Sequence, residues 1–290
     1  MRHRVFVVAG VILLAFVKAP SAQAYTSAGD RIFPATILLP QIAPTDEAYL
    51  TGLSQPEAGG RNSSLTANYA KTITSNLAID LAEGYNWTSP TAGHGQQGWQ
   101  NTALSATWEI WDRPDDEFLL STSVEREFGA TGAVHAGASP VGATTGWLFF
   151  GKGFGTAASD AVKPVAVAGA LGYQLGDTTG RPDLLQAGLV LEYSLPYFAA
   201  AVSDQALPGW ATKLTPMLEI FATTPEQHRS GAATTLLFGP GVDYAAAGWE
   251  VGAEALLPAT RGSGQGTGAT LQLHIALDYL TPGLLGRPIF

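Results

Sequence analysis

The sequence predicts an all-β fold, namely a transmembrane antiparallel up-and-down β-barrel of about 12 strands, with 10 strands as the smaller alternative. Three observations support this prediction. Apolar and polar residues alternate with a period of two along most of the chain, as in strands with one wet face. Several of these stretches have ten or more residues, which suits a tilted membrane strand better than a soluble one. Only 13% of the 290 residues are charged, about half the usual share for a globular protein.

Composition excludes several classes of protein. The chain contains no cysteine, which excludes a disulfide scaffold and a thiolate metal site. It has 24 acidic against 15 basic residues and a pI near 4.9. Phosphate binding needs concentrated Lys and Arg, so a nucleic-acid partner is not expected. The mean hydropathy of +0.12 is high for a chain without a long apolar run after its first 24 residues.

The N-terminus has the pattern of an export signal. Arg2 and Arg4 precede an apolar run at residues 5–17, and small residues follow up to Ala24. The run is shorter than the roughly 20 residues that a spanning helix needs. We therefore expect a signal peptide at residues 1–24, cleaved after Ala24. Its removal takes away three cations and leaves 12 basic against 24 acidic residues.

Eleven candidate strands follow from the alternation. A barrel with both chain ends on one side has an even number of strands, so a further strand is expected before residue 62, seeded by residues 35–39 or 48–50. Otherwise residues 25–60 form a periplasmic extension or a partial plug, because four prolines interrupt any long strand there. The barrel domain is expected at residues 61–290. The eleven candidates are residues 62–73, 76–88, 98–112, 116–128, 145–154, 163–175, 184–196, 211–222, 232–244, 248–257 and 268–280.

Each candidate strand has two unlike faces. At residues 185–195 one face carries Leu185, Leu189 and Leu191, and the other carries Gln186 and Glu192. A soluble β-sandwich also alternates, but its outward faces should be charged. Lipid can cover an apolar face while a lumen holds the polar one, which favours a membrane barrel. Tyrosines and tryptophans near strand ends would then form interfacial girdles. These aromatic residues are Trp87, Trp99, Trp111, Trp147, Trp210, Trp249, Tyr173, Tyr193, Tyr197 and Tyr279.

Two short segments carry a resemblance to a known family. Residues 149–155 read Phe-Phe-Gly-Lys-Gly-Phe-Gly, and residues 286–290 read Gly-Arg-Pro-Ile-Phe. The terminal phenylalanine resembles the C-terminal signature of bacterial outer-membrane proteins, which the barrel-assembly machinery reads. Together with the signal peptide and the long strands, the segments resemble the outer-membrane transporters of the meta-pathway phenol-degradation group. The resemblance implies a Gram-negative outer-membrane protein that passes small hydrophobic or aromatic compounds.

The faces opposite the apolar ones supply the candidate lumen-lining residues. Ten of them are carboxylates, and Lys213 is the clearest cation among them. Acidic groups in a confined pore attract cations and repel anions, so an acidic lumen that favours neutral or cationic solutes is predicted. The alternative is that about half of the carboxylates lie near strand ends and face bulk water. The candidates are Asp80, Glu109, Glu125, Glu127, Glu192, Lys213, Glu219, Asp243, Glu250, Glu254, Gln272, His274 and Asp278.

No catalytic site is predicted. His274 and Asp278 share a strand face, but four residues along a strand span about 13 Å, so the two side chains cannot touch. The chain has no Gly-x-Ser-x-Gly nucleophile motif. No cofactor and no metal site are expected either.

The predicted function is that of an outer-membrane channel or passive transporter for small molecules. Its partners would be outer-membrane lipid and a small-molecule solute. One alternative is a structural or surface-interaction barrel with a lumen too narrow or too filled to conduct. Another is a secreted soluble β-sandwich that binds a ligand. The width of the lumen distinguishes the first alternative from a channel.

Overall fold

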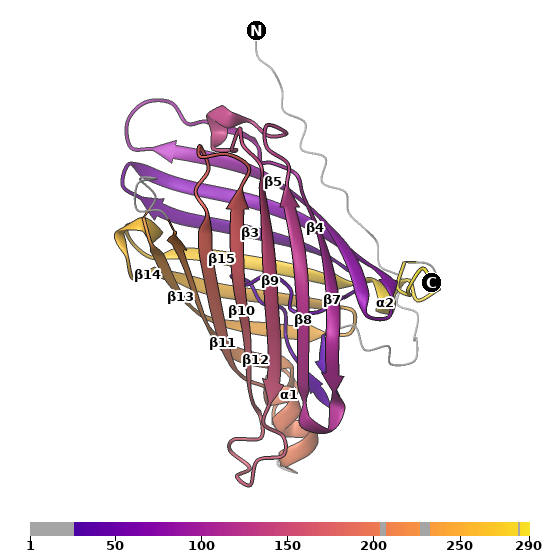
Figure 1. Ribbon diagram of the computed structural model, residues 1–290. Helices are drawn as coiled ribbons and strands as arrows, with labels where there is room; N and C mark the ends of the chain where they lie inside the picture. Colours follow the sequence, from indigo (N-terminus) through magenta and orange to yellow (C-terminus); the bar gives the residue numbers. More distant parts are fainter. Residues whose placement is uncertain (1–25, 204–206, 227–232, 284) are drawn as a thin grey trace.

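The computed structural model describes residues 26–203, 207–226, 233–283 and 285–290, so the predicted signal peptide lies outside the described residues. Its main feature is a closed antiparallel barrel (Figure 1). The strands of the barrel are β3 (Glu47–Glu57), β4 (Gly60–Thr74), β5 (Leu77–Pro90), β6 (Gln97–Trp99), β7 (Ala103–Arg113), β8 (Phe118–Glu127), β9 (Ala143–Gly153), β10 (Val165–Gly176), β11 (Leu184–Tyr193), β12 (Leu214–Pro225), β13 (Thr235–Ala246), β14 (Trp249–Pro258) and β15 (Gly268–Ala276).

Each strand pairs with its neighbours in the chain, and β15 pairs with β3 to close the sheet. The short β6 and the longer β7 both pair with β5, at different heights, and together occupy one position in the barrel. The barrel therefore has twelve strand positions, which confirms the predicted fold class and strand number.

Short elements lie outside the barrel strands. A two-stranded hairpin, β1 (Ser27–Ala28) and β2 (Arg31–Ile32), precedes them. In the described part of the chain, no helix is long and apolar enough to cross a membrane. The helices are η1 (Pro114–Asp116), η2 (Val134–Ala136), α1 (Leu195–Tyr197), η3 (Phe198–Val202), η4 (Ala211–Lys213), η5 (Arg261–Ser263) and α2 (Leu277–Leu280).

The first barrel strand is β3, which begins at Glu47 and includes the predicted seed 48–50. The barrel thus starts fourteen residues before the predicted boundary at residue 61. The other predicted seed, residues 35–39, forms no strand. Prolines at 34 and 40 flank that seed and remove two of the N–H donors that a strand would need.

Several predicted strands are shorter than expected, and two of them are interrupted or end early for a visible reason. The stretch 98–112 is interrupted between β6 and β7, where the Asn101 side chain donates to Glu127 Oε1 (2.7 Å) and to the Ser139 carbonyl (2.8 Å). These bonds tie the interruption to the loop after β8. The stretch 268–280 ends as a strand at Ala276, and α2 follows. Alternation continues in the sequence beyond Ala276, but the backbone turns into a helix.

The barrel has two distinct ends. We call the end at which β3 begins and β15 ends the terminal end, because Glu47 and Ala276 face each other there across the sheet. It also holds α1, α2 and the β7–β8 turn (Figure 1). The opposite end carries the loop after β8, at residues 128–142, and the terminal end carries the longest connection between strands, at residues 194–213.

The apolar core lies inside the barrel. Phe33, Leu39 and Ile42 of the segment before β3 form one buried cluster with strand residues such as Phe149 and Val190. The strand members come from inward positions, since their neighbours in sequence are exposed on the outer face. The lumen is therefore occupied by part of the chain itself.

Candidate functional site in the barrel lumen

Alternation along each strand separates an apolar outer face from a polar inner one. On the outer face Leu189 is 44% exposed and Leu271 is 58% exposed, whereas Glu219 on the inner face is 0% exposed. Single exposed leucines are ordinary, but so many exposed apolar side chains on one face of a sheet are rare in a soluble protein. In a barrel that spans a membrane, hydrocarbon surrounds them.

The structure places most of the predicted lumen residues on the inner face. These residues lie on β5, β8 and β11–β15, where the strand pairing shows which residues share the inner face. Glu109 lies on β7 next to a break in the β7–β8 register, close to the terminal end. The inner-face residues are Asp80, Glu125, Glu127, Glu192, Glu219, Asp243, Glu250, Glu254, Gln272 and His274.

Two predicted lumen residues lie outside the strands. Lys213 ends η4 just before β12, and its Nζ is 5.7 Å from the ring centroid of Tyr244. Asp278 lies in α2, beyond the last strand. There, burial raises the pKa of Asp278 to about 6, with a smaller contribution from the charge of Asp46. Both predictions were wrong because the alternation was extended past the ends of the strands.

The segment of residues 26–46, here called the inner segment, enters the barrel from the terminal end and returns there to start β3. On its way out of the lumen, the Ile42 carbonyl accepts a hydrogen bond from Ser121 Oγ of β8. Further on, Glu47 Oε1 accepts from Gln41 Nε2 (2.6 Å) and from Thr45 Oγ1 (2.7 Å). The inner segment thus occupies the lumen along part of its length.

Glu219 of β12 holds the middle of the inner segment. Its Oε1 accepts the N–H of Ile37 at 2.7 Å. Its Oε2 accepts the N–H groups of Leu38 and Leu39 at 2.9 and 3.2 Å. Burying a carboxylate is costly unless donors replace its water, and three consecutive backbone N–H groups do so here. Glu250 of β14 binds the segment in the same way, because its Oε1 accepts the N–H of Ala35 at 2.8 Å.

Arg31 anchors the inner segment at the terminal end. Its side chain is completely buried and its Nε lies 3.3 Å from Glu117 Oε2. The guanidinium also donates to the Pro164 carbonyl (3.1 Å) and stacks 3.9 Å above the centroid of the Tyr197 ring. The Tyr197 hydroxyl donates to Glu117 Oε1 at 2.8 Å. Burial, followed by this bond, raises the pKa of Tyr197 to about 12.

Inward glycines leave room for the apolar side chains of the inner segment. A methyl group at Gly188 would lie 2.6 Å from Leu39 Cγ, and one at Gly252 would lie 2.7 Å from Ile37 Cδ1. A methyl group at Gly239 would lie 2.9 Å from Leu38 Cδ1, and one at Gly151 would lie 3.0 Å from Phe33 Cζ. Real Cβ atoms essentially never approach other atoms closer than 3.0 Å. At three of these four positions, a side chain on the wall would therefore require the inner segment to shift.

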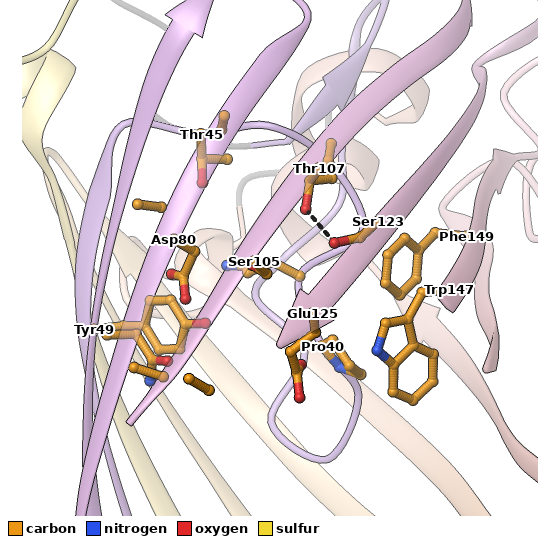
Figure 2. A pocket seen from close by; sticks show the side chains of 17 residues that line it. Pro40, Thr45, Tyr49, Asp80, Ser105, Thr107, Ser123, Glu125, Trp147 and Phe149 are labelled. Atoms are coloured by element: carbon orange, nitrogen blue, oxygen red, sulfur yellow. Dashed lines mark hydrogen bonds between the residues drawn. The ribbon is translucent and has the colours of Figure 1, made fainter. Parts of the chain in front are cut away.

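Beside the inner segment, a cavity of about 220 Å³ remains on the side of β3, β4, β5, β7, β8 and β9. Figure 2 shows Asp80 and Tyr49 at one side of it and Trp147 and Phe149 at the other, with Glu125 between them. Trp147 was predicted to belong to an interfacial girdle. Instead it faces inward and stacks on Phe149 with ring centroids 5.8 Å apart.

His274 lies near this cavity and has its own partners. Its Nδ1 is 3.1 Å from Glu47 Oε2, and its ring stacks on Tyr49 with a centroid distance of 4.7 Å. Asp278 is not among the hydrogen-bond partners of His274 in the described residues. Nor do the described residues include a group of three or more His, Cys, Asp or Glu side chains arranged to hold a metal ion.

Sequence reasoning left the role of residues 25–60 open among three expectations, and it missed the inward position of Trp147. A signal for Trp147 was present, because Thr145, Trp147, Phe149 and Gly151 share one strand face. The glycines opposite the inner segment lie on strands far apart in sequence, so only the folded barrel brings them together.

A closed antiparallel barrel with an apolar outer face and a polar lumen has the architecture of outer-membrane β-barrels. No protein-family model matches the sequence, and no curated protein matches it. Solved structures with a similar fold include an outer-membrane channel from Pseudomonas putida, with a TM-score of 0.56 and 11% identity over 84% of this chain and 99% of that one. The likeness to this channel shows that the chain has an outer-membrane barrel fold.

Two further solved structures are similar at lower TM-scores. The KdgM porin has a TM-score of 0.43 and 10% identity, over 78% of this chain and 98% of that one. LpxR from Salmonella typhimurium has a TM-score of 0.47 and 8% identity, over 79% of this chain and 99% of that one.

Proposed function

We propose that this protein is an outer-membrane channel whose lumen is closed by the inner segment. The terminal end, where the first barrel strand begins and the last one ends, faces the periplasm, and the opposite end faces outward. The outward leucines contact lipid, and the barrel-assembly machinery inserts the chain after the signal peptide is removed. Support comes from the barrel fold, which is shared with an outer-membrane channel, and from the polar inner face.

The observation that carries this proposal is the bonding of the inner segment to the wall. Its backbone is held by hydrogen bonds to Glu219 and Glu250 and does not pair with any barrel strand among the described residues. Because the segment adds no strand to the sheet, the pairing of the barrel wall does not depend on the segment's staying in the lumen.

The solutes would be small, and neutral or cationic rather than anionic. Glu192, Asp243 and Glu254 are buried on the inner face, and none of them forms an ion pair within the described part of the chain. An acidic wall repels anions. Resemblance to the phenol-degradation transporters supports hydrophobic or aromatic compounds as cargo. The role is passive transport, with no catalytic step.

Planar-bilayer recordings test the proposal. The full chain should show low conductance, and Glu219→Ala should raise the open probability at least severalfold, because three N–H donors of the inner segment lose their acceptor. Open channels should select K⁺ over Cl⁻ in a salt gradient. Glu57→Ala, at the exposed β3–β4 turn, is the matched control and should behave as the parent. Equal conductance of all three proteins, or selection of Cl⁻, would contradict the proposal.

A second function is favoured by the apolar cluster inside the barrel. Phe33, Leu39 and Ile42 are each buried to at least 96%, and a lumen filled in this way suits a structural barrel that conducts nothing. The same recordings separate the two functions. A structural barrel stays silent in Glu219→Ala as well, whereas a closed channel opens.

A further inference from the structure

The cavity beside the inner segment has walls of mixed chemistry. Asp80 of β5 and Glu125 of β8 both line it, together with the hydroxyl groups of Ser105, Thr107 and Ser123. Thr107 Oγ1 donates to Ser123 Oγ at 3.1 Å, as Figure 2 shows. The inner segment closes one side of the cavity through residues 40–45.

Neither carboxylate of the cavity has a cationic partner among the described residues. In the described part of the chain, Asp80 and Glu125 take part in no ion pair. Arg181 approaches the next inward carboxylate, Glu127, with NH2 at 2.5 Å from Oε2. Two unpaired carboxylates in one small cavity attract a compact cation.

Trp147 adds a hydrogen-bond donor that has no acceptor. Its side chain is only 6% exposed, and its Nε1 has no hydrogen-bond partner in the described residues. A buried indole N–H ordinarily finds a partner. Figure 2 shows the indole turned with its nitrogen toward the cavity. A ligand in the cavity should therefore carry a neutral or anionic hydrogen-bond acceptor for this N–H group.

Cavity size limits the ligand to one aromatic ring with a short chain. An engineered cavity of about 150 Å³ holds benzene, and this one measures about 220 Å³. Phe149 and Trp147 offer ring faces on one side, and the carboxylates lie within the same small space. A ligand of this size can reach both groups at once.

We propose that the cavity is a binding site for hydroxylated arylalkylamines, with the ammonium group between Asp80 and Glu125 and a ring hydroxyl accepting from Trp147 Nε1. The ring lies against Trp147 and Phe149. This inference rests on the proposed channel function, since it names the cargo class of that lumen.

Titration calorimetry on the full chain in detergent tests the proposal with four probes of one size. Tyramine carries both the ammonium and the ring hydroxyl. Tyrosol replaces the ammonium by a hydroxyl, phenethylamine lacks the ring hydroxyl, and 3-(4-hydroxyphenyl)propionate carries a carboxylate. Tyramine should bind at least tenfold more tightly than tyrosol and severalfold more tightly than phenethylamine. The propionate should not bind.

Two variants assign the groups. Asp80→Asn with Glu125→Gln should weaken tyramine at least tenfold and abolish its advantage over tyrosol. Trp147→Phe keeps the ring and should abolish only the advantage of tyramine over phenethylamine. Asp115→Asn with Asp160→Asn removes two charges from exposed turns and should leave all affinities unchanged. Heat-dependent mobility on gels checks that each variant forms the barrel.

Failure of this inference can be told apart from failure of the channel proposal. If the parent protein conducts but binds tyramine no better than tyrosol, or if the Asp80 and Glu125 double variant binds tyramine normally, the assigned site is wrong and the channel stands. If tyramine binds as expected but no variant conducts, the site stands as a binding site and the channel proposal is overturned.

Discussion

Glu219 shows how a single residue can hold a closed lumen. A carboxylate with no exposed surface would ordinarily lose far more hydration energy than it regains. The three N–H groups of residues 37–39 replace that hydration, and charge-assisted bonds of this type are about twice as strong as neutral ones. Because the donors belong to the backbone, the interaction depends on the path of the inner segment rather than on its side chains.

Outward leucines give a prediction at the same scale. Leu189→Arg should lower the free energy of unfolding from a bilayer by about 2–4 kcal/mol if the residue lies near the midplane. The reason is that Leu189 projects from the outer face. Gln186→Arg, on the inner face of the same strand, should lower the free energy of unfolding much less. Urea titration followed by tryptophan fluorescence in vesicles measures both, and equal costs would contradict the assigned faces.

Alternation was a good guide to the strand faces, but it was extended too far at two strand ends and was overruled at Trp147. Alternation placed Glu192 and Gln272 on the inner face because every second residue of a pleated strand faces the same way. Lys213 and Asp278 were misplaced because η4 and α2 replace the strand geometry there. Trp147 was misassigned because aromatic content was weighed ahead of its position in β9.

At the scale of elements, the inner segment and the inner face of the barrel wall are complementary in shape. Leucine and isoleucine side chains of residues 37–39 lie opposite glycines on β11, β13 and β14. Glycine weakens a strand, so several of them at inward positions need a reason, and close approach of the inner segment supplies it. The segment is therefore as much a part of the folded barrel as the strands are.

Gly188→Ala tests this fit. The new methyl group would overlap Leu39, and overpacking of this kind costs about 1–3 kcal/mol. Amide hydrogen exchange at residues 37–39 should then speed up at least about fivefold, because the segment separates from Glu219 more often. Gly146→Ala is the matched control, since nothing lies within 4 Å of a methyl group there. Unchanged exchange in Gly188→Ala would show that the inner segment does not depend on this contact.

The element that sequence reasoning located least well is this same segment. Its prolines indicated that residues 25–60 could not form one long strand, and a partial plug was one of three expectations. No local pattern distinguishes these expectations, because residues 31–42 contact side chains and glycines of β8, β9 and β11–β14. Contacts between segments so distant in sequence form only when the barrel closes.

At the scale of the whole molecule, one arrangement accounts for both composition and structure. Twelve strands need little charge because lipid surrounds their outer face. Several of the acidic residues lie on the inner face, where the inner segment donates hydrogen bonds to Glu47, Glu219 and Glu250. The central claim is that this segment, and not the barrel wall, determines whether the lumen conducts.

A reversible cross-link tests that claim most directly. The chain has no cysteine of its own. A Cβ atom at Gly188 would lie 2.6 Å from Leu39 Cγ, which puts the two Cβ atoms at most about 4.1 Å apart, inside the range of up to about 4.5 Å found in disulfides. Leu39→Cys with Gly188→Cys, in the Glu219→Ala background, should give silent bilayers when oxidised and steady current after dithiothreitol. The same current before and after reduction would contradict the account.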